Sequence, residues 1–92
     1  MSDWIARRCL VSGRVQGVWY RAATRERAVA LGITGHAINR PDGRVEVLAC
    51  GSPAAVEAMC AWLWKGSPAS HVIAVEVEPA APATRPEGFV TG

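Results

Sequence analysis

The segment from Gly13 to Arg21 holds the residues best suited to chemistry, because a glycine-rich loop there joins an apolar stretch to a helical pattern. Backbone amides at a helix start have no partner inside the helix, and with the helix dipole they form an anion site. Gly17 has no Cβ to block a phosphate, and we expect Gly13 to allow a sharp turn off the strand. Arg21 falls in the first helical turn and can add a charge-assisted contact to the same anion.

The same glycines also fit a plain turn between a strand and a helix, in which they serve backbone geometry only. A short glycine pattern is weak evidence for a ligand by itself. Both interpretations place the loop between a strand and a helix, so the neighbouring elements determine how it is held.

Alternating apolar residues predict the strands, and apolar stripes at helical spacing predict the helices. Ser52-Pro53 is a strong helix start, with a capping serine before a first-turn proline. Pro41-Asp42-Gly43 predicts a hairpin turn between two apolar runs. The predicted elements are a strand at 4–11, a helix from 19 or 20 to 31, strands at 34–39 and 44–50, a helix at 53–65, a strand at 71–78 and a short strand at 89–91.

The order strand, helix, strand, strand, helix, strand is that of the split β-α-β, ferredoxin-like sandwich, an α+β fold. We expect an antiparallel sheet with both helices packed on one face, in a single domain over residues 1–92. A chain this short leaves little room for an enclosed cavity. A functional site should therefore be a surface cradle built from loop backbone.

The composition excludes several classes of function. The chain is 50% hydrophobic and 20% charged, which is ordinary for a globular domain, and its net charge of +2 is dispersed, which argues against nucleic-acid binding. Cys9, Cys50 and Cys60 form an odd set without C-x-x-C spacing, so neither a zinc site nor a disulfide framework is expected. No signal peptide and no apolar run of roughly 18 residues are found, so we expect a cytoplasmic protein without a membrane span.

The glycine-rich segment matches the signature G-x-V-Q-G-V-x-[FY]-R without a mismatch. The matching positions are Gly13, Val15, Gln16, Gly17, Val18, Tyr20 and Arg21. A second stretch, from Gly35 through Asn39 to Gly43, Val45 and Gly51, resembles the pattern G-[FYW]-[AVC]-x-N-x-x-x-G-x-V-x-x-x-x-x-G. Both motifs are those of the acylphosphatase family, and the resemblance extends from about Arg7 to Glu78.

In that family the loop amides and an arginine hold the phosphoryl group, and an asparagine positions the attacking water. The resemblance implies a phosphate-binding set of Arg14, Val15, Gln16, Gly17, Val18 and Arg21. It implies catalytic roles for Arg21 and Asn39. The implied reaction is hydrolysis of an acyl phosphate to a carboxylate and inorganic phosphate, with no metal and no cofactor. The expected partner is this small-molecule substrate, with phosphate as a competitive inhibitor and no nucleic acid or membrane, and we expect a monomer.

Several of these residues are open to other interpretations. Asn39 fits the start of the hairpin equally well by position alone. Gln16 is expected to contribute its backbone amide rather than its side chain. His36 and His71 are candidate acid–base groups, but a lone histidine on a strand is typically a packing or surface residue. A non-catalytic module that senses a phosphorylated ligand is the alternative function.

Three residues near Asn39 depart from the family pattern and leave the turnover rate open. His36 stands where an aromatic residue is usual, Ile38 where a polar residue is common, and Arg40 where many members have a small hydroxyl residue. Single-stranded RNA binding needs exposed aromatic residues on the central strands. The sequence disfavours it, because the corresponding positions are Cys9, Val11, Val45 and Val47.

Overall fold

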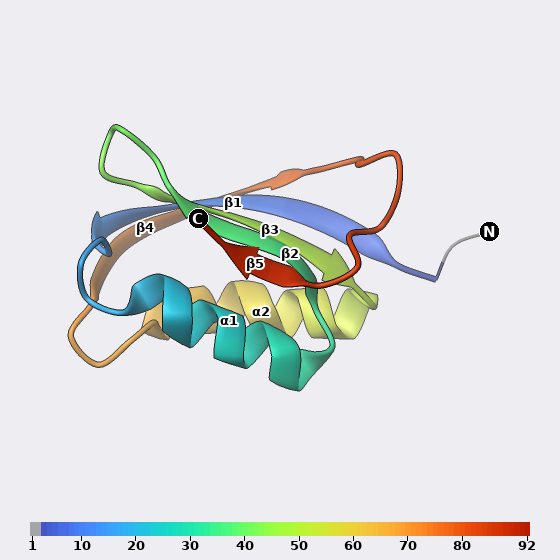
Figure 1. The fold of residues 1–92 in the computed structure, drawn as a ribbon, viewed down its shortest axis with the longest axis horizontal. Helices are drawn as coiled ribbons and strands as arrows, with labels where there is room; N and C mark the ends of the chain where they lie inside the picture. Colours follow the sequence, from blue (N-terminus) through green and yellow to red (C-terminus); the bar gives the residue numbers. More distant parts are fainter. Residues whose placement is uncertain (1–2) are drawn as a thin grey trace.

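A computed structural model describes residues 3–92, so Met1 and Ser2, which the predicted domain includes, lie outside the described residues. The elements are β1 (Ile5–Arg14), α1 (Tyr20–Leu31), β2 (Thr34–Asn39), β3 (Val45–Gly51), α2 (Pro53–Lys65), β4 (His71–Pro79) and β5 (Phe89–Thr91). The strands form one sheet in the order β4-β1-β3-β2-β5, and both helices cover the same face (Figure 1). The predicted ferredoxin-like α+β fold is confirmed.

The sheet differs from the prediction at the edge formed by β5. The pairs β1–β3, β1–β4 and β2–β3 are antiparallel, but β5 runs parallel to β2, with Gly35 opposite Phe89. The expectation of a purely antiparallel sheet was therefore wrong, and the sheet is mixed. The 80–88 connection carries the chain from one edge of the sheet to the other, so β5 starts near the end where β4 stops. Strand β5 must then run opposite to β4. Strand β2 also runs opposite to β4, so β5 and β2 are parallel.

Strand β1 continues past its predicted end at Val11 and carries a β-bulge at Ser12 and Gly13. The φ of Gly13 is +123°, and a Cβ at this position would collide with the carbonyl oxygen of His71 on β4. The expectation that Gly13 makes a sharp turn off the strand was wrong. Glycine is needed there because the neighbouring strand approaches closely.

The main core lies between the helices and the sheet, as the apolar stripes predicted. α1 buries Tyr20, Thr24 and Ala28, and α2 buries Val56, Met59 and Leu63. The central strands meet them with Cys9, Val11, Val45 and Val47. A smaller cluster of Ala6, Leu48 and Cys50 packs with Trp4 and Ala80.

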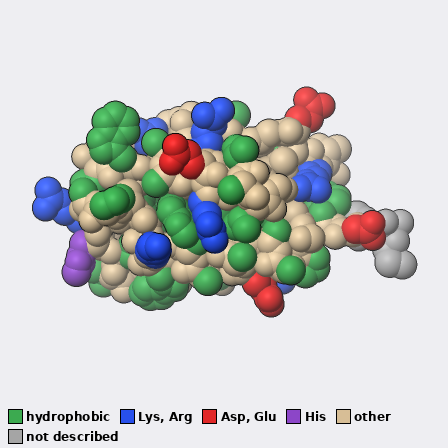
Figure 2. All heavy atoms as spheres, turned by 90° about the horizontal axis from the view of Figure 1, so that it is seen from below, with side chains coloured by type: hydrophobic (Ala, Val, Ile, Leu, Met, Phe, Trp, Pro, Cys, Tyr) green, Lys and Arg blue, Asp and Glu red, His purple; other side chains and the backbone are tan. Residues whose placement is uncertain are grey.

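The three cysteines are free thiols, and Cys9 and Cys50 are buried. The Sγ of buried Cys9 lies 3.6 Å from the Sγ of Cys60, which is partly exposed. On the helix side of the molecule, Lys and Arg side chains are interspersed with acidic and hydrophobic ones (Figure 2). Among residues 3–92, no helix has the length and hydropathy needed to cross a membrane.

Candidate active site

The loop between β1 and α1 directs two valine side chains into the core and exposes Trp19. Val15 and Val18 are buried in the core, whereas Gly17 is exposed. Within residues 3–92, the amides from Gln16 to Arg21 donate no hydrogen bond. A row of unpaired amides at a helix start favours an anion through both direct hydrogen bonding and the helix dipole. The first turn of α1 contains no acidic residue that would repel the anion.

Gly17 allows the loop to take this shape. Its φ is +72°, in the left-handed region, and no heavy atom lies within 4 Å of the position that a Cβ would occupy. The surface above Gly17 is therefore open to a ligand, as the sequence predicted. Its conformation is one that glycine adopts without steric cost.

Three hydrogen bonds hold the loop in place, and the sequence predicted none of them. The side-chain nitrogen of Gln16 donates to the carbonyls of Arg40 at 2.9 Å and Arg44 at 3.0 Å, so the side chain ties the loop to the β2–β3 hairpin. The buried Ser67 hydroxyl donates to the carbonyl of Val18 at 2.7 Å. The expectation that Gln16 matters only through its backbone was too narrow.

Tyr20 fixes the start of α1 against α2. Its hydroxyl donates to the carbonyl of Leu63 at 2.7 Å, and its ring is almost completely buried. Burial raises the pKa of this phenol well above its ordinary value, so Tyr20 stays protonated and acts as a structural donor. The helix start that carries the unpaired amides is therefore rigidly placed.

Arg21 and Asn39 meet at the end of β5, although they are far apart in the sequence. Nη1 of Arg21 donates to the carbonyl of Gly92 at 2.5 Å, and the backbone amide of Asn39 donates to the same oxygen at 3.4 Å. Asn39 is the last residue of β2 and is exposed, and its side-chain amide makes no hydrogen bond to any residue from 3 to 92. The structure thus brings the Arg21 side chain and the backbone of Asn39 to one carbonyl oxygen just after β5.

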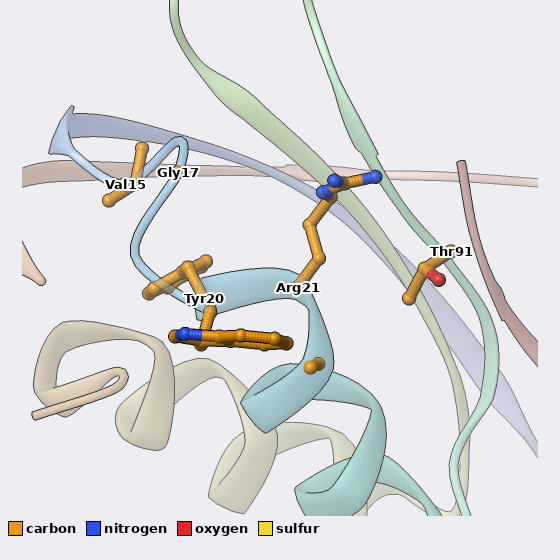
Figure 3. Close-up of a pocket in the computed structure, with 7 residues that line it drawn as sticks. Val15, Gly17, Tyr20, Arg21 and Thr91 are labelled. Carbon is orange, nitrogen blue, oxygen red and sulfur yellow. The ribbon is translucent and has the colours of Figure 1, made fainter.

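A surface cleft of about 390 Å³ adjoins this edge. It is lined by Val15, Gly17, Trp19, Tyr20, Arg21, Ala22 and Thr91. Figure 3 shows the Arg21 side chain extending from the start of α1 into the space between the loop and Thr91. Sequence reasoning missed Trp19 and Thr91.

The other predicted site residues do not line this cleft. Gln16 and Val18 secure the loop through the contacts described above, and Asn39 lies at the neighbouring strand end. Arg14 is the last residue of β1, is exposed, and is opposite His71 in the β1–β4 ladder. The structure therefore gives Arg14 a place beside the cradle with its side chain in solvent.

Two of the three residues that depart from the family pattern, His36 on β2 and Arg40 just after it, contact Glu46 on β3. Nε2 of His36 lies 2.8 Å from one oxygen of Glu46, and Nη1 of Arg40 lies 2.9 Å from the other. Burial raises the pKa of Glu46, but the contacts with His36 and Arg40 outweigh it and hold that pKa below its ordinary value. Both departures thus bind a common carboxylate.

Within residues 3–92, no three His, Cys, Asp or Glu side chains are grouped so that they could hold a metal ion. The polar groups at the cleft are instead backbone amides, one guanidinium and one nearby amide side chain. Groups of these kinds can donate hydrogen bonds to an anion or to water, and an amide oxygen can also accept from water. The arrangement suits binding of a phosphoryl group.

Comparisons with known proteins identify the family. A family model described as Acylphosphatase matches residues 7–91. The acylphosphatase of Xanthomonas oryzae pv. oryzae strain MAFF 311018 is 64% identical over 88 residues, which cover 95% of this chain and 98% of that protein. The solved acylphosphatase of Coxiella burnetii has a TM-score of 0.92 and 32% identity, over 98% of this chain and 94% of that one. The acylphosphatase of Bacillus subtilis has a TM-score of 0.90 and 32% identity, over 96% and 98%.

These findings confirm the resemblance that the two motifs indicated. The family match, the sequence relatives and the solved structures all support acylphosphatase activity. The chain belongs to the acylphosphatase family.

Proposed function

We propose that this chain hydrolyses the carboxyl-phosphate bond of small acyl phosphates, with the phosphoryl group seated on the loop of Arg14, Val15, Gln16, Gly17 and Val18. The observation that carries this proposal is the row of unpaired amides from Gln16 to Arg21 beside an open surface at Gly17. Amides held in place before the substrate arrives stabilise charge on phosphoryl oxygens without reorganisation. Phosphoryl transfer depends chiefly on such positioning and electrostatic stabilisation.

Arg21 is proposed to bind the same phosphoryl group from the helix side. Of its five N–H donors, only those on Nη1 contact another residue between 3 and 92. The remaining donors are available for a bidentate contact with phosphate oxygens. A guanidinium in this place neutralises part of the substrate charge and assists the approach of water to phosphorus.

Asn39 is proposed to orient the attacking water. Its side-chain amide can accept from water through oxygen while donating through nitrogen, and it carries no charge that would repel the anionic substrate. Water attacks phosphorus, the bond between phosphorus and the acyl oxygen breaks, and the products are a carboxylate and inorganic phosphate. A carboxylate is a good leaving group, so the reaction needs no strong general acid.

The compartment, the oligomeric state, the lack of cofactors and the inhibition by phosphate are also proposed. Free thiols at Cys9, Cys50 and Cys60 favour a reducing compartment such as the cytoplasm. Residues 1–92 are proposed to act as one domain and as a monomer, without a metal or an organic cofactor. Inorganic phosphate, which shares the phosphoryl seat with the substrate, should inhibit competitively.

The test compares Arg21→Ala and Asn39→Ala with benzoyl phosphate as substrate. Arg21→Ala should lose both turnover and inhibition by phosphate. Asn39→Ala should keep the inhibition constant of phosphate while kcat falls about 10²–10³-fold, the usual loss for one preorganised group. Arg27→Ala, an exposed arginine elsewhere on α1, is the control and should match the wild type. A chelator should change nothing.

The site assignment would be wrong if both variants hydrolysed benzoyl phosphate like the wild type. A wild-type protein that bound phosphate without hydrolysis above background would instead support a phosphate-sensing module. The two results are distinguishable in one set of assays.

A further inference from the structure

Trp19 combines an exposed ring with a strained backbone. Its side chain is 82% exposed, and its φ of 62° makes it the one non-glycine residue with a positive φ among residues 3–92. A bulky residue pays a steric cost in this region, and an exposed indole gains little burial to offset that cost. Strain of this kind is typically found where a residue serves a ligand.

The position of Trp19 indicates which ligand this is. It lies between Val18 of the loop and Arg21 of the first helical turn, and it lines the same cleft as Gly17 and Arg21. The remaining lining side chains near the surface, Ala22 and Thr91, carry no charge. The cleft therefore has an anion-binding part, formed by Gly17 and Arg21, and an uncharged part that includes a large aromatic ring.

In an acyl phosphate, a single oxygen joins the acyl carbon to phosphorus. A phosphoryl group bound at Gly17 and Arg21 must therefore place its acyl group within a few ångströms, inside the same 390 Å³ cleft. A flat apolar acyl group can stack on the indole, whereas an acetyl group is too small to cover it. The exposed ring gains its burial only when such a substrate binds.

We propose that the acyl group of the substrate packs against the indole ring of Trp19. The enzyme therefore favours aromatic or extended apolar acyl phosphates over acetyl phosphate. This inference rests on the proposed function, since it takes the phosphoryl seat at Gly17 and Arg21 as given. Trp19 acts as a specificity-determining residue, and the strained conformation at the helix start directs its ring toward the substrate rather than into the core.

The experiment measures kcat/KM for benzoyl phosphate and acetyl phosphate in the wild type, Trp19→Ala, Trp19→Phe and Trp64→Ala. In Trp19→Ala, the preference for benzoyl over acetyl phosphate should fall about tenfold, mainly through the KM of benzoyl phosphate. Trp19→Phe keeps an aromatic ring and should retain most of the preference. Trp64, also exposed but on α2, is the matched control, and its replacement should leave the preference unchanged.

Equal losses on both substrates in Trp19→Ala, or no change in their ratio, would overturn the inference while leaving the proposed function intact. A loss of preference in Trp64→Ala as large as in Trp19→Ala would also overturn it. If the wild type hydrolysed neither compound, the proposed function would fail and this inference with it. Melting curves of each variant confirm that the compared proteins are folded.

Discussion

The two helices begin in opposite ways. α2 starts at Ser52, an extended residue whose hydroxyl accepts from the amide of Ala55 at 3.2 Å, and Pro53 follows it. α1 starts at Trp19, which is left-handed and gives the helix no side-chain cap. A cap contributes about 1 kcal/mol, and a left-handed non-glycine residue costs about 1–2 kcal/mol. The chain caps one helix start by itself and, within residues 3–92, leaves the amides at the other without a partner, at a cost in stability.

The largest effect should come from Gly17→Ala, compared with Gly32→Ala. The two glycines have φ values of +72° and +71°, and neither would bring a Cβ within 4 Å of another atom. Both substitutions should lower the free energy of unfolding by about 1 kcal/mol through the same backbone strain. Only Gly17→Ala puts a methyl into the cradle, so only it should lower kcat/KM, by about 100-fold.

Urea denaturation and steady-state assays of the two variants test this pair. Equal losses of activity would show that strain, rather than access to the loop amides, decides the result. A Gly17→Ala variant as active as wild type would show that Gly17 is not part of the phosphate-binding site.

Phosphate binding should distinguish the two helix starts directly. At ten times its dissociation constant, phosphate should stabilise the protein by about 1.4 kcal/mol and raise Tm by roughly 6–10 °C. The amide resonances from Gln16 to Arg21 should shift, whereas those of the capped start near Ala55 should not. Arg21→Ala should abolish both effects. Shifts of similar size at both helix starts would mean that any helix start attracts the anion.

Stability should change in opposite directions when the two starting residues are replaced. Ser52→Ala removes the cap of α2 and should lower the free energy of unfolding by about 1 kcal/mol without affecting activity. Trp19→Gly releases the left-handed strain and should raise that free energy by up to about 1 kcal/mol. Urea denaturation measures both. A destabilised Trp19→Gly variant would show that the indole contributes to folding despite its exposure.

The smallest effect concerns Glu46 on β3, in the hairpin that Gln16 ties to the α1 start. The pKa of Glu46 is depressed in the folded protein, because its contacts with His36 and Arg40 outweigh its burial. Its contribution to stability is therefore present above the unfolded pKa of about 4.5 and is lost as the pH falls through the folded value. Glu46→Gln should flatten the decline of Tm in acid. An unchanged pH profile would contradict this role.

The sequence predicted the elements well because their signals are local. Apolar periodicity, the Ser52-Pro53 start and the Pro41-Asp42-Gly43 turn each act within a few residues. The direction of β5 was not predictable in this way, since it depends on where the 80–88 connection crosses the sheet. The reason for glycine at position 13 was also missed, because the carbonyl that a Cβ would meet there belongs to β4, far away along the chain.

The sequence predicted where the glycine-rich loop lies, but it did not predict the hydrogen bonds that hold the loop in place. Gln16 binds backbone carbonyls of the hairpin, and carbonyls are present at every residue, so no side-chain pattern marks its partners. No sequence pattern indicates that the hydroxyl of Ser67 donates to the carbonyl of Val18 either. Nothing about tryptophan suggests a positive φ at position 19, and only the structure shows that strain. The catalytic roles of Arg21 and Asn39 stay predictions until the variants are measured.

The bonds from Gln16 also tie the active site to the folding of the chain. They span 24 and 28 residues, so the loop cannot settle before the β2–β3 hairpin has closed. Phosphate affinity should therefore appear during refolding together with long-range strand pairing, and later than α1 itself. In the native protein, each local opening of the hairpin should release the loop and interrupt catalysis until the strands pair again.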